Sequence, residues 1–192
     1  MIKKLLLPLL LLMCLAQWLV PGKLIYDSEK TTEEGISFKF KIRPVDPYDP
    51  FRGKYITLSF DDNNVMRDTL EEFLRDQSVF VLVEADSTGF AKVKEISNSS
   101  FSEPNYFEAS VLWQNKSKED SLQTIELDFP FKKFFLEESL APEAETAYSE
   151  SRNDTIPAYA LVSVMDGKAI LRDVILNDSS IADVVKARQK KR

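Results

Sequence analysis

The sequence predicts an α+β domain of mainly antiparallel strands, arranged as a small barrel or a sandwich, behind an N-terminal transmembrane helix. Three observations predict this fold class. The chain opens with an apolar segment, continues with segments that alternate apolar and polar residues, and separates those segments with short polar turns. Its 192 residues are enough for one folding unit with a substantial core.

The first element is the apolar segment 5–20, which follows two lysines and is extended by residues 24–26. A bilayer span needs about 20 apolar residues, so we expect residues 1–26 to form an uncleaved membrane anchor. The positive-inside rule then keeps the amino terminus inside and places the rest of the chain outside the cytoplasm. Two residues of the apolar run and two aromatic residues suited to the interfaces mark this anchor: Leu5, Leu12, Trp18 and Tyr26.

Two other interpretations of this segment remain open. A cleaved signal peptide needs an apolar stretch of about 7 to 15 residues and a small-x-small cleavage site. The sequence Cys-Leu-Ala at residues 14–16 is a poor version of that site. The third interpretation is a buried helix of a soluble protein.

Strand signals dominate the residues that follow the anchor. Gly35 is expected to end the helix, and residues 36–43 alternate apolar and polar side chains as a half-buried strand does. Residues 55–60 are predicted to form a second strand that pairs with the first. Residues 68–77 are the one helical signal of the middle region, because their acidic residues fit a capping box and their apolar residues share a face.

Three hairpins are predicted, each as two strand segments joined by a polar turn: residues 79–96, 106–129 and 158–176. The third hairpin has the strongest turn signal in the chain, the dipeptide Asp166 and Gly167.

Two further elements lie in the second half of the chain. An acidic helix interrupted near Pro142 is predicted over residues 136–150, and a short strand over residues 181–185. We therefore expect one β-rich domain over residues 27–185, followed by a basic tail over residues 186–192.

Composition excludes most enzyme classes. His is absent, which removes the commonest general base and every Ser-His-Asp or Cys-His mechanism. One Cys allows neither an internal disulfide nor a thiolate metal cluster, so we expect no metal and no cofactor. The net charge of −6 argues against a nucleic-acid partner.

Residues 43–60 read Arg-Pro-Val-Asp-Pro-Tyr-Asp-Pro-Phe-Arg-Gly-Lys-Tyr-Ile-Thr-Leu-Ser-Phe. This segment resembles the signature of the GDYXXLXY family of membrane-anchored bacterial proteins. Gly53, Tyr55 and Leu58 match the named motif, whereas Lys54 stands where the motif has Asp, and a Phe replaces its final Tyr. The resemblance implies a location in the bacterial inner membrane and a multi-pass membrane protein as partner, rather than a particular chemistry.

The loop that carries this signature has two interpretations. As a recognition rim, its prolines hold charged side chains in place without entropy loss on binding. As an architectural crossover, it joins two strands and pairs its charges internally. The candidate binding residues of this motif loop are Asp46, Pro47, Asp49, Arg52, Gly53 and Tyr55.

Other constellations carry no defined chemistry. Carboxylate pairs such as Glu137 and Glu138 lack a spacing that identifies a mechanism, and no Ser-Lys dyad stands in the order that signal peptidases use. The aromatic cluster at residues 131–135 is either core or a surface patch. The basic tail is either a solubilising end or a segment that binds anionic lipid.

We therefore expect a single-span, membrane-anchored protein that has no catalytic activity and assists an integral membrane partner. The alternative is an extracytoplasmic binding module that holds a peptide or cell-envelope ligand at the motif loop. A third interpretation is an enzyme that uses carboxylates or a Ser-Lys pair.

Overall fold

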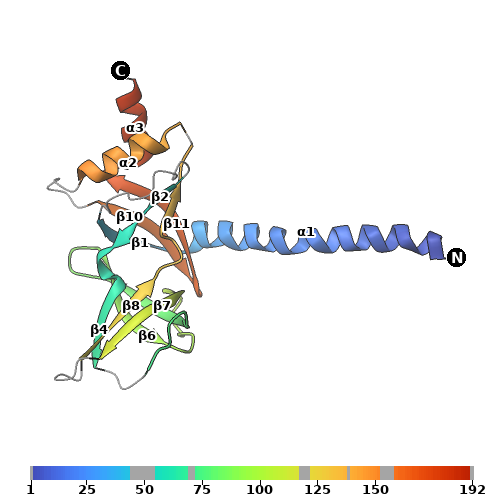
Figure 1. The fold of residues 1–192 in the computed structure, drawn as a ribbon, viewed down its shortest axis with the longest axis horizontal. Coiled ribbons are helices and arrows are strands. Elements are labelled where there is room, and N and C mark those ends of the chain that lie inside the picture. Colours follow the sequence, from blue (N-terminus) through green and yellow to red (C-terminus); the bar gives the residue numbers. More distant parts are fainter. Residues whose placement is uncertain are drawn as a thin grey trace.

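The computed structural model describes residues 2–43, 55–68, 72–116, 122–137, 139–151 and 158–190. A long helix, α1 (Ile2–Glu34), projects away from the rest of the chain, with the amino terminus at its free end (Figure 1). The strands and two shorter helices form a body at the other end of α1.

Helix α1 ends where it meets the body, at Gly35. The N–H of Gly35 donates to the carbonyl oxygen of Thr31 at 3.1 Å, which closes the last turn. A Cβ at Gly35 would collide with that oxygen and would lie 3.2 Å from the carbonyl oxygen of Val164. The predicted helix end is confirmed, and glycine is required there because the backbone passes too close to its neighbours for a side chain.

The first sheet has five antiparallel strands in the order β12–β11–β10–β1–β3. The inward residues Phe38, Phe40 and Ile42 are buried, and the residues between them face outward, which confirms the predicted first strand. The bounds of the five strands are β1 (Ile36–Arg43), β3 (Ser59–Phe60), β10 (Tyr159–Met165), β11 (Lys168–Leu176) and β12 (Ser179–Ser180).

The strand predicted over residues 55–60 is divided in two. Its second part, β3, pairs with the end of β1 as expected, whereas its first part, β2 (Tyr55–Thr57), pairs with β9 (Lys133–Phe135). The division falls at Leu58, whose side chain is buried and whose N–H donates to the carbonyl of Lys132 at 2.8 Å. The predicted pairing with β1 is therefore correct only for the second part.

The second sheet also has five antiparallel strands, in the order β4–β8–β7–β5–β6. It contains the first two predicted hairpins, β5 with β6 and β7 with β8. A short 3-10 helix, η1 (Asp61–Asn63), precedes it. The strand bounds are β4 (Asn64–Asp68), β5 (Ser78–Ala85), β6 (Ala91–Ser97), β7 (Tyr106–Lys116) and β8 (Leu122–Asp128).

The helix predicted over residues 68–77 is wrong. Asp68 ends β4, and the described residues 72–77 form loop and turn. The side chain of Phe73 is buried, and its N–H donates to Oε1 of Gln114 in β7 at 2.7 Å. A hydrogen bond to a distant strand thus replaces the local bonds that a helix needs.

The third predicted hairpin is formed by β10 and β11. Asp166 and Gly167 have positive φ values of 46° and 88°, as a two-residue turn of type I′ requires. The N–H of Gly167 donates to the carbonyl of Tyr106 at 3.0 Å, and its own carbonyl accepts from the N–H of Glu108 at 3.0 Å. The two sheets therefore meet at this hairpin tip and form a nearly closed, barrel-like wall.

Two helices complete the body. The helix α2 (Ala141–Glu150) starts near Pro142 instead of being interrupted there, because proline fits the first turn of a helix. The strand predicted over residues 181–185 is wrong, because these residues begin α3 (Ile181–Gln189). Val185 is buried four residues after the buried start of α3, which is the spacing of one helix face.

One hydrophobic core joins both sheets. Phe40 of the first sheet stands at its centre, 1% exposed. Its ring centroid lies 5.0–6.2 Å from those of four other phenylalanines: Phe60, Phe107, Phe129 and Phe131. The predicted fold class, α+β with mainly antiparallel strands, is confirmed.

Candidate functional site

Only one of the six residues predicted for the motif loop can be placed. Five of them lie outside the described residues: Asp46, Pro47, Asp49, Arg52 and Gly53. The sixth, Tyr55, begins β2. The two interpretations of the loop therefore both remain predictions.

Tyr55 belongs to a small aromatic patch on the pair of strands β2 and β9. Its ring centroid lies 5.6 Å from that of Phe135, which is 67% exposed, and the ammonium nitrogen of Lys133 lies 4.8 Å from the Tyr55 centroid. A cation–π contact of this kind is worth about 0.5–1 kcal/mol at an exposed site. Phe131 lies in the core and Phe135 lies on the surface. The core interpretation of the predicted aromatic cluster is therefore correct for Phe131, and the surface-patch interpretation is correct for Phe135.

The following motif residues belong to the core. Leu58 and Phe60 are each 4% exposed, and the ring of Phe60 packs against those of Phe40 and other core phenylalanines. Just before the loop, the carbonyl of Arg43 accepts a hydrogen bond from the buried hydroxyl of Tyr148 at 2.6 Å. The described residues on both sides of the loop are thus held by the core.

Helix α1 presents apolar side chains on every side. Of the four predicted anchor residues, Leu12, Trp18 and Tyr26 are 64%, 77% and 65% exposed, and the side chain of Leu5 lies outside the described part. Soluble proteins rarely expose continuous apolar surface of this kind. Among the described residues, no helix is both long enough and apolar enough to cross a membrane.

The last turns of α1 are held against the first sheet. Thr31 is fully buried, and its hydroxyl donates to the carbonyl of Asp27 at 2.9 Å. The hydroxyl of the buried Ser163 in β10 donates to the carbonyl of Thr32 at 3.4 Å. At the hairpin tip, Nζ of Lys168 donates to Oδ2 of Asp27 at 2.5 Å. These contacts fix the direction in which α1 leaves the body.

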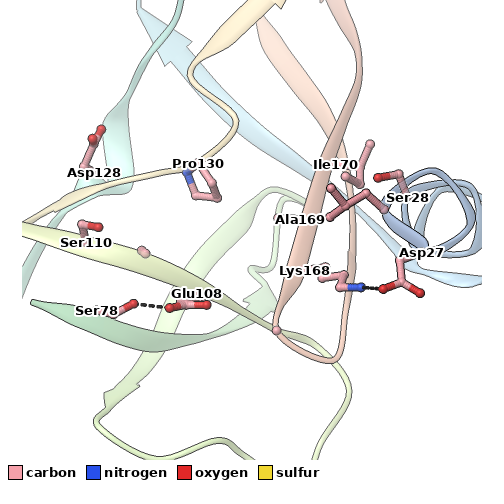
Figure 2. Close-up of a pocket in the computed structure, with 13 residues that line it drawn as sticks. Asp27, Ser28, Ser78, Glu108, Ser110, Asp128, Pro130, Lys168, Ala169 and Ile170 are labelled. Atoms are coloured by element: carbon pink, nitrogen blue, oxygen red, sulfur yellow. Dashed lines mark hydrogen bonds and ion pairs between the residues drawn. The ribbon is translucent and has the colours of Figure 1, made fainter. Parts of the chain in front are cut away.

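A groove of about 480 Å³ lies beside this junction (Figure 2). One wall is α1, through Leu24, Asp27 and Ser28, and the other walls come from β5, β7, β11 and the end of β8. This volume is in the range of ligand pockets. Small residues leave much of it open, among them Ser78, Ala109, Ser110, Gly167 and Ala169.

Two of the three carboxylates in the groove have an ammonium partner. The hydrogen bond from Lys168 holds the pKa of the Asp27 carboxyl below its usual value, and the charges of Lys23 and Lys30 act in the same direction. Asp128 accepts from Nζ of Lys132 at 2.6 Å. Both negative charges are therefore already balanced within the protein.

The third carboxylate is that of Glu108 on β7. It accepts a hydrogen bond from the hydroxyl of Ser78 on the neighbouring strand (Figure 2). Among the described residues, the neutral hydroxyl of Ser78 is the side-chain partner of the Glu108 carboxylate. Glu108 therefore supplies the groove with a negative charge that no described cation balances.

Polar groups of the groove are engaged with one another among the described residues. Its one lysine, Lys168, is engaged by a carboxylate and not by a serine. Across the described residues, no group of three or more His, Cys, Asp and Glu side chains could hold a metal ion. Of the predicted carboxylate pair Glu137 and Glu138, the second residue lies outside the described residues.

The predicted basic tail begins inside α3, which contains Lys186 and Arg188. A guanidinium nitrogen of Arg188 lies 2.8 Å from Oε2 of Glu150 in α2, so one of its charges is paired within the protein. The last two residues of the tail lie outside the described part, and both interpretations of the tail stay predictions.

Sequence reasoning missed the groove. Its residues come from segments as far apart as Asp27 and Lys168, and none belongs to a recognisable motif. The turn at Asp166 and Gly167 was the one available signal, because it places the following lysine at a hairpin tip. That α1 packs beside this tip follows only from the tertiary structure.

Comparison with known proteins identifies one similarity. A family model described as GDYXXLXY protein matches residues 17–174. The match begins within α1 and ends within β11, so it includes the motif loop, the second sheet, the first sheet except β12 and the end of β11, and all the residues that line the groove. No curated protein and no solved structure is similar enough to give a match.

Proposed function

The chain belongs to the GDYXXLXY protein family, and from this premise we propose that it is a single-span membrane protein that assists an integral membrane partner and has no catalytic activity of its own. In this proposal α1 crosses the inner membrane of a bacterium. The amino terminus lies inside, and the β-rich body lies on the extracytoplasmic side.

The exposed apolar surface of α1 is the observation that carries the proposal. A helix that is apolar on all sides is stable when it is surrounded by protein or by lipid, and α1 projects away from the body (Figure 1). The proposed span is residues 5–26, whose 22 residues would measure about 33 Å, compared with about 30 Å for the hydrocarbon core of a bilayer. The side chains at the start of this proposed span lie outside the part that the structure describes.

The junction between α1 and the body supports the accessory role. In Figure 1 the body extends across the axis of α1 and not along it. Because the hydrogen bond from Ser163 to Thr32 and the ion pair of Lys168 with Asp27 hold the end of α1 against the sheet, the body in this proposal spreads over the membrane surface in one orientation. Neighbouring membrane proteins are then within its reach.

Membrane attachment is tested by alkaline extraction of native membranes, combined with intact-mass measurement. We expect the full chain from residue 1 to remain in the membrane pellet. Leu12→Arg, which puts a charge into the proposed span at a cost of about 2.5–3.5 kcal/mol, should release the protein. Leu74→Arg is the matched control, because Leu74 is 73% exposed on the body. A mature chain that starts at residue 17, or release of the wild type, would refute the anchor.

A binding module at the motif loop is the second candidate function. The half-buried Tyr55 and the exposed Phe135, whose rings are in contact, favour it. If the loop is a recognition rim, Asp49→Ala and Arg52→Ala should abolish partner capture while the melting temperature stays unchanged. If the loop is architectural, capture should fall only in proportion to the loss of folded protein. Parallel thermal melts and pull-downs from detergent-solubilised membranes distinguish the two.

A further inference from the structure

We propose that the groove beside α1 is the docking site for the juxtamembrane end of a transmembrane helix of the partner, and that a Lys or Arg of that segment binds Glu108. This inference rests on the proposed function, because it assumes that α1 lies in a membrane beside a partner. To the proposed function it adds the surface where the partner binds and the charge by which that surface selects the partner.

The position of the groove is the first argument. The exposed apolar surface of α1 continues to Leu24, and Leu24 is also part of the groove wall. A partner helix that packs along α1 in the bilayer therefore reaches the groove with its next turn. Ser28 and Ala169 at this end have short side chains (Figure 2), so another backbone can approach closely.

Charge is the second argument. Asp27 and Asp128 already have lysine partners at 2.5 Å and 2.6 Å, whereas the described side-chain partner of Glu108 is the hydroxyl of Ser78. A cation in the groove gains most at Glu108, because there it forms a charge-assisted hydrogen bond without displacing an existing ion pair. The groove therefore favours a basic segment over a neutral or acidic one.

The same charges argue against a second copy of this chain as the occupant. A second copy in the same membrane would present its own α1 at the height of the groove. Residues 23–34 of α1 contain two lysines and four carboxylates, a balance of 2 − 4 = −2, which becomes −1 when Lys168, the partner of Asp27, is included. This acidic segment would be repelled by Glu108, so the basic end of a different protein is the better complement.

Photocrosslinking of the full chain in native membranes tests the proposal. A benzophenone amino acid is placed at Ser110 in the groove wall, at Leu15 on the exposed surface of α1, or at the exposed Lys94 of β6 as a control. We expect Ser110 to cross-link to a membrane protein within about two helical turns of the end of a transmembrane segment that carries Lys or Arg. Mass spectrometry of the cross-linked peptide reports this position.

Charge variants give the second measurement. Glu108→Gln keeps an acceptor for Ser78 but removes the charge of this exposed carboxylate. It should lower the cross-link yield from Ser110 by up to about fivefold, as expected for an ion pair at an exposed site. Glu95→Gln, an exposed carboxylate on β6, should leave the yield unchanged. Equal melting temperatures of the two variants show that the loss does not come from unfolding.

The outcomes separate this inference from the proposed function. A cross-link from Leu15 but none from Ser110 overturns the groove as docking site and leaves the membrane role intact. A Ser110 cross-link to a second copy, to lipid or to a water-soluble protein also overturns it. So does an unchanged cross-link yield in the Glu108→Gln variant. Release of the wild-type chain by alkaline extraction refutes the proposed function itself.

Discussion

The ammonium nitrogen of Lys168 lies 2.5 Å from Oδ2 of Asp27, although the two residues are 141 positions apart in the chain. Lys168 directly follows the turn at Asp166 and Gly167, and Gly167 is also where the two sheets meet. One hairpin tip therefore holds the end of α1 and the joint between the sheets. A large tilt of α1 away from the hairpin tip would separate the two charges of this ion pair.

The first prediction concerns the pH dependence of stability. Because Lys168 lowers the pKa of Asp27 in the folded state, the pair stabilises the fold fully above the ordinary Asp pKa of about 3.9. That contribution is lost as the pH falls through the lower, folded-state value. Between about pH 4 and pH 2, wild-type stability should therefore fall more steeply than that of Lys168→Met. Denaturant titrations over this range measure the difference, and parallel curves would show that the pair does not stabilise the fold.

The second prediction concerns the junction of α1 with β1. Gly35→Ala should destabilise the protein by about 1–3 kcal/mol, the usual cost of overpacking, because its Cβ would collide with the carbonyl of Thr31. Gly22→Ala is the matched control, since nothing lies within 4 Å of a Cβ there. It should stabilise α1 by about 0.5–1 kcal/mol. Thermal melts in detergent compare the two, and equal effects would contradict the close approach.

The third prediction concerns the phenylalanine core. Phe40→Ala should cost about 3–5 kcal/mol, the usual penalty for truncating a buried Phe, because Phe40 contacts four other rings. Phe135→Ala should change stability by no more than about 0.5 kcal/mol, since Phe135 is 67% exposed. Chemical denaturation measures both. A small loss in Phe40→Ala would mean that the inward face of β1 is wrongly assigned.

The fourth prediction concerns the hydrogen bond next to the motif loop. Tyr148→Phe should cost about 1 kcal/mol, the usual net value of one hydrogen bond, because the buried hydroxyl of Tyr148 binds the carbonyl of Arg43 at 2.6 Å. Burial also raises the pKa of Tyr148, so its absorbance should titrate above the usual tyrosine pKa of about 10. Tyr26→Phe, on the exposed part of α1, should leave unfolding unchanged. Equal unfolding curves for both variants would show that this bond contributes nothing.

Local signals predicted several elements correctly. The alternation around Phe38 and Phe40 identified β1 and its buried face, because strand side chains point to opposite faces in turn. Gly35 marked the end of α1, and the turn at Asp166 and Gly167 marked the hairpin of β10 and β11, because few residues other than glycine fit these positions. Each of these signals acts within a few residues, so the sequence alone contains it.

Long-range contacts overruled local signals elsewhere. The segment around Phe73 has a helical pattern, but its backbone binds Gln114 in a distant strand. Residues 181–185 form a short and mostly apolar segment. This pattern fits a strand or a helix equally well, and packing against the body selects the helix. The pairing of β2 with β9 likewise depends on which edges meet, which no local pattern specifies.

The sequence by itself determined the apolar character of α1, the family and the lack of histidine chemistry, since each depends only on which residues are present and in what order. The tertiary structure alone decided that Asp27 meets Lys168 and that Ser78 meets Glu108. These pairs join segments 141 and 30 positions apart. Ser78 meets Glu108 only when β5 pairs with β7, and Asp27 meets Lys168 only when α1 docks beside the tip of the β10–β11 hairpin. The groove that they border could not be found before that packing was known, because a surface assembled from distant segments leaves no pattern along the chain.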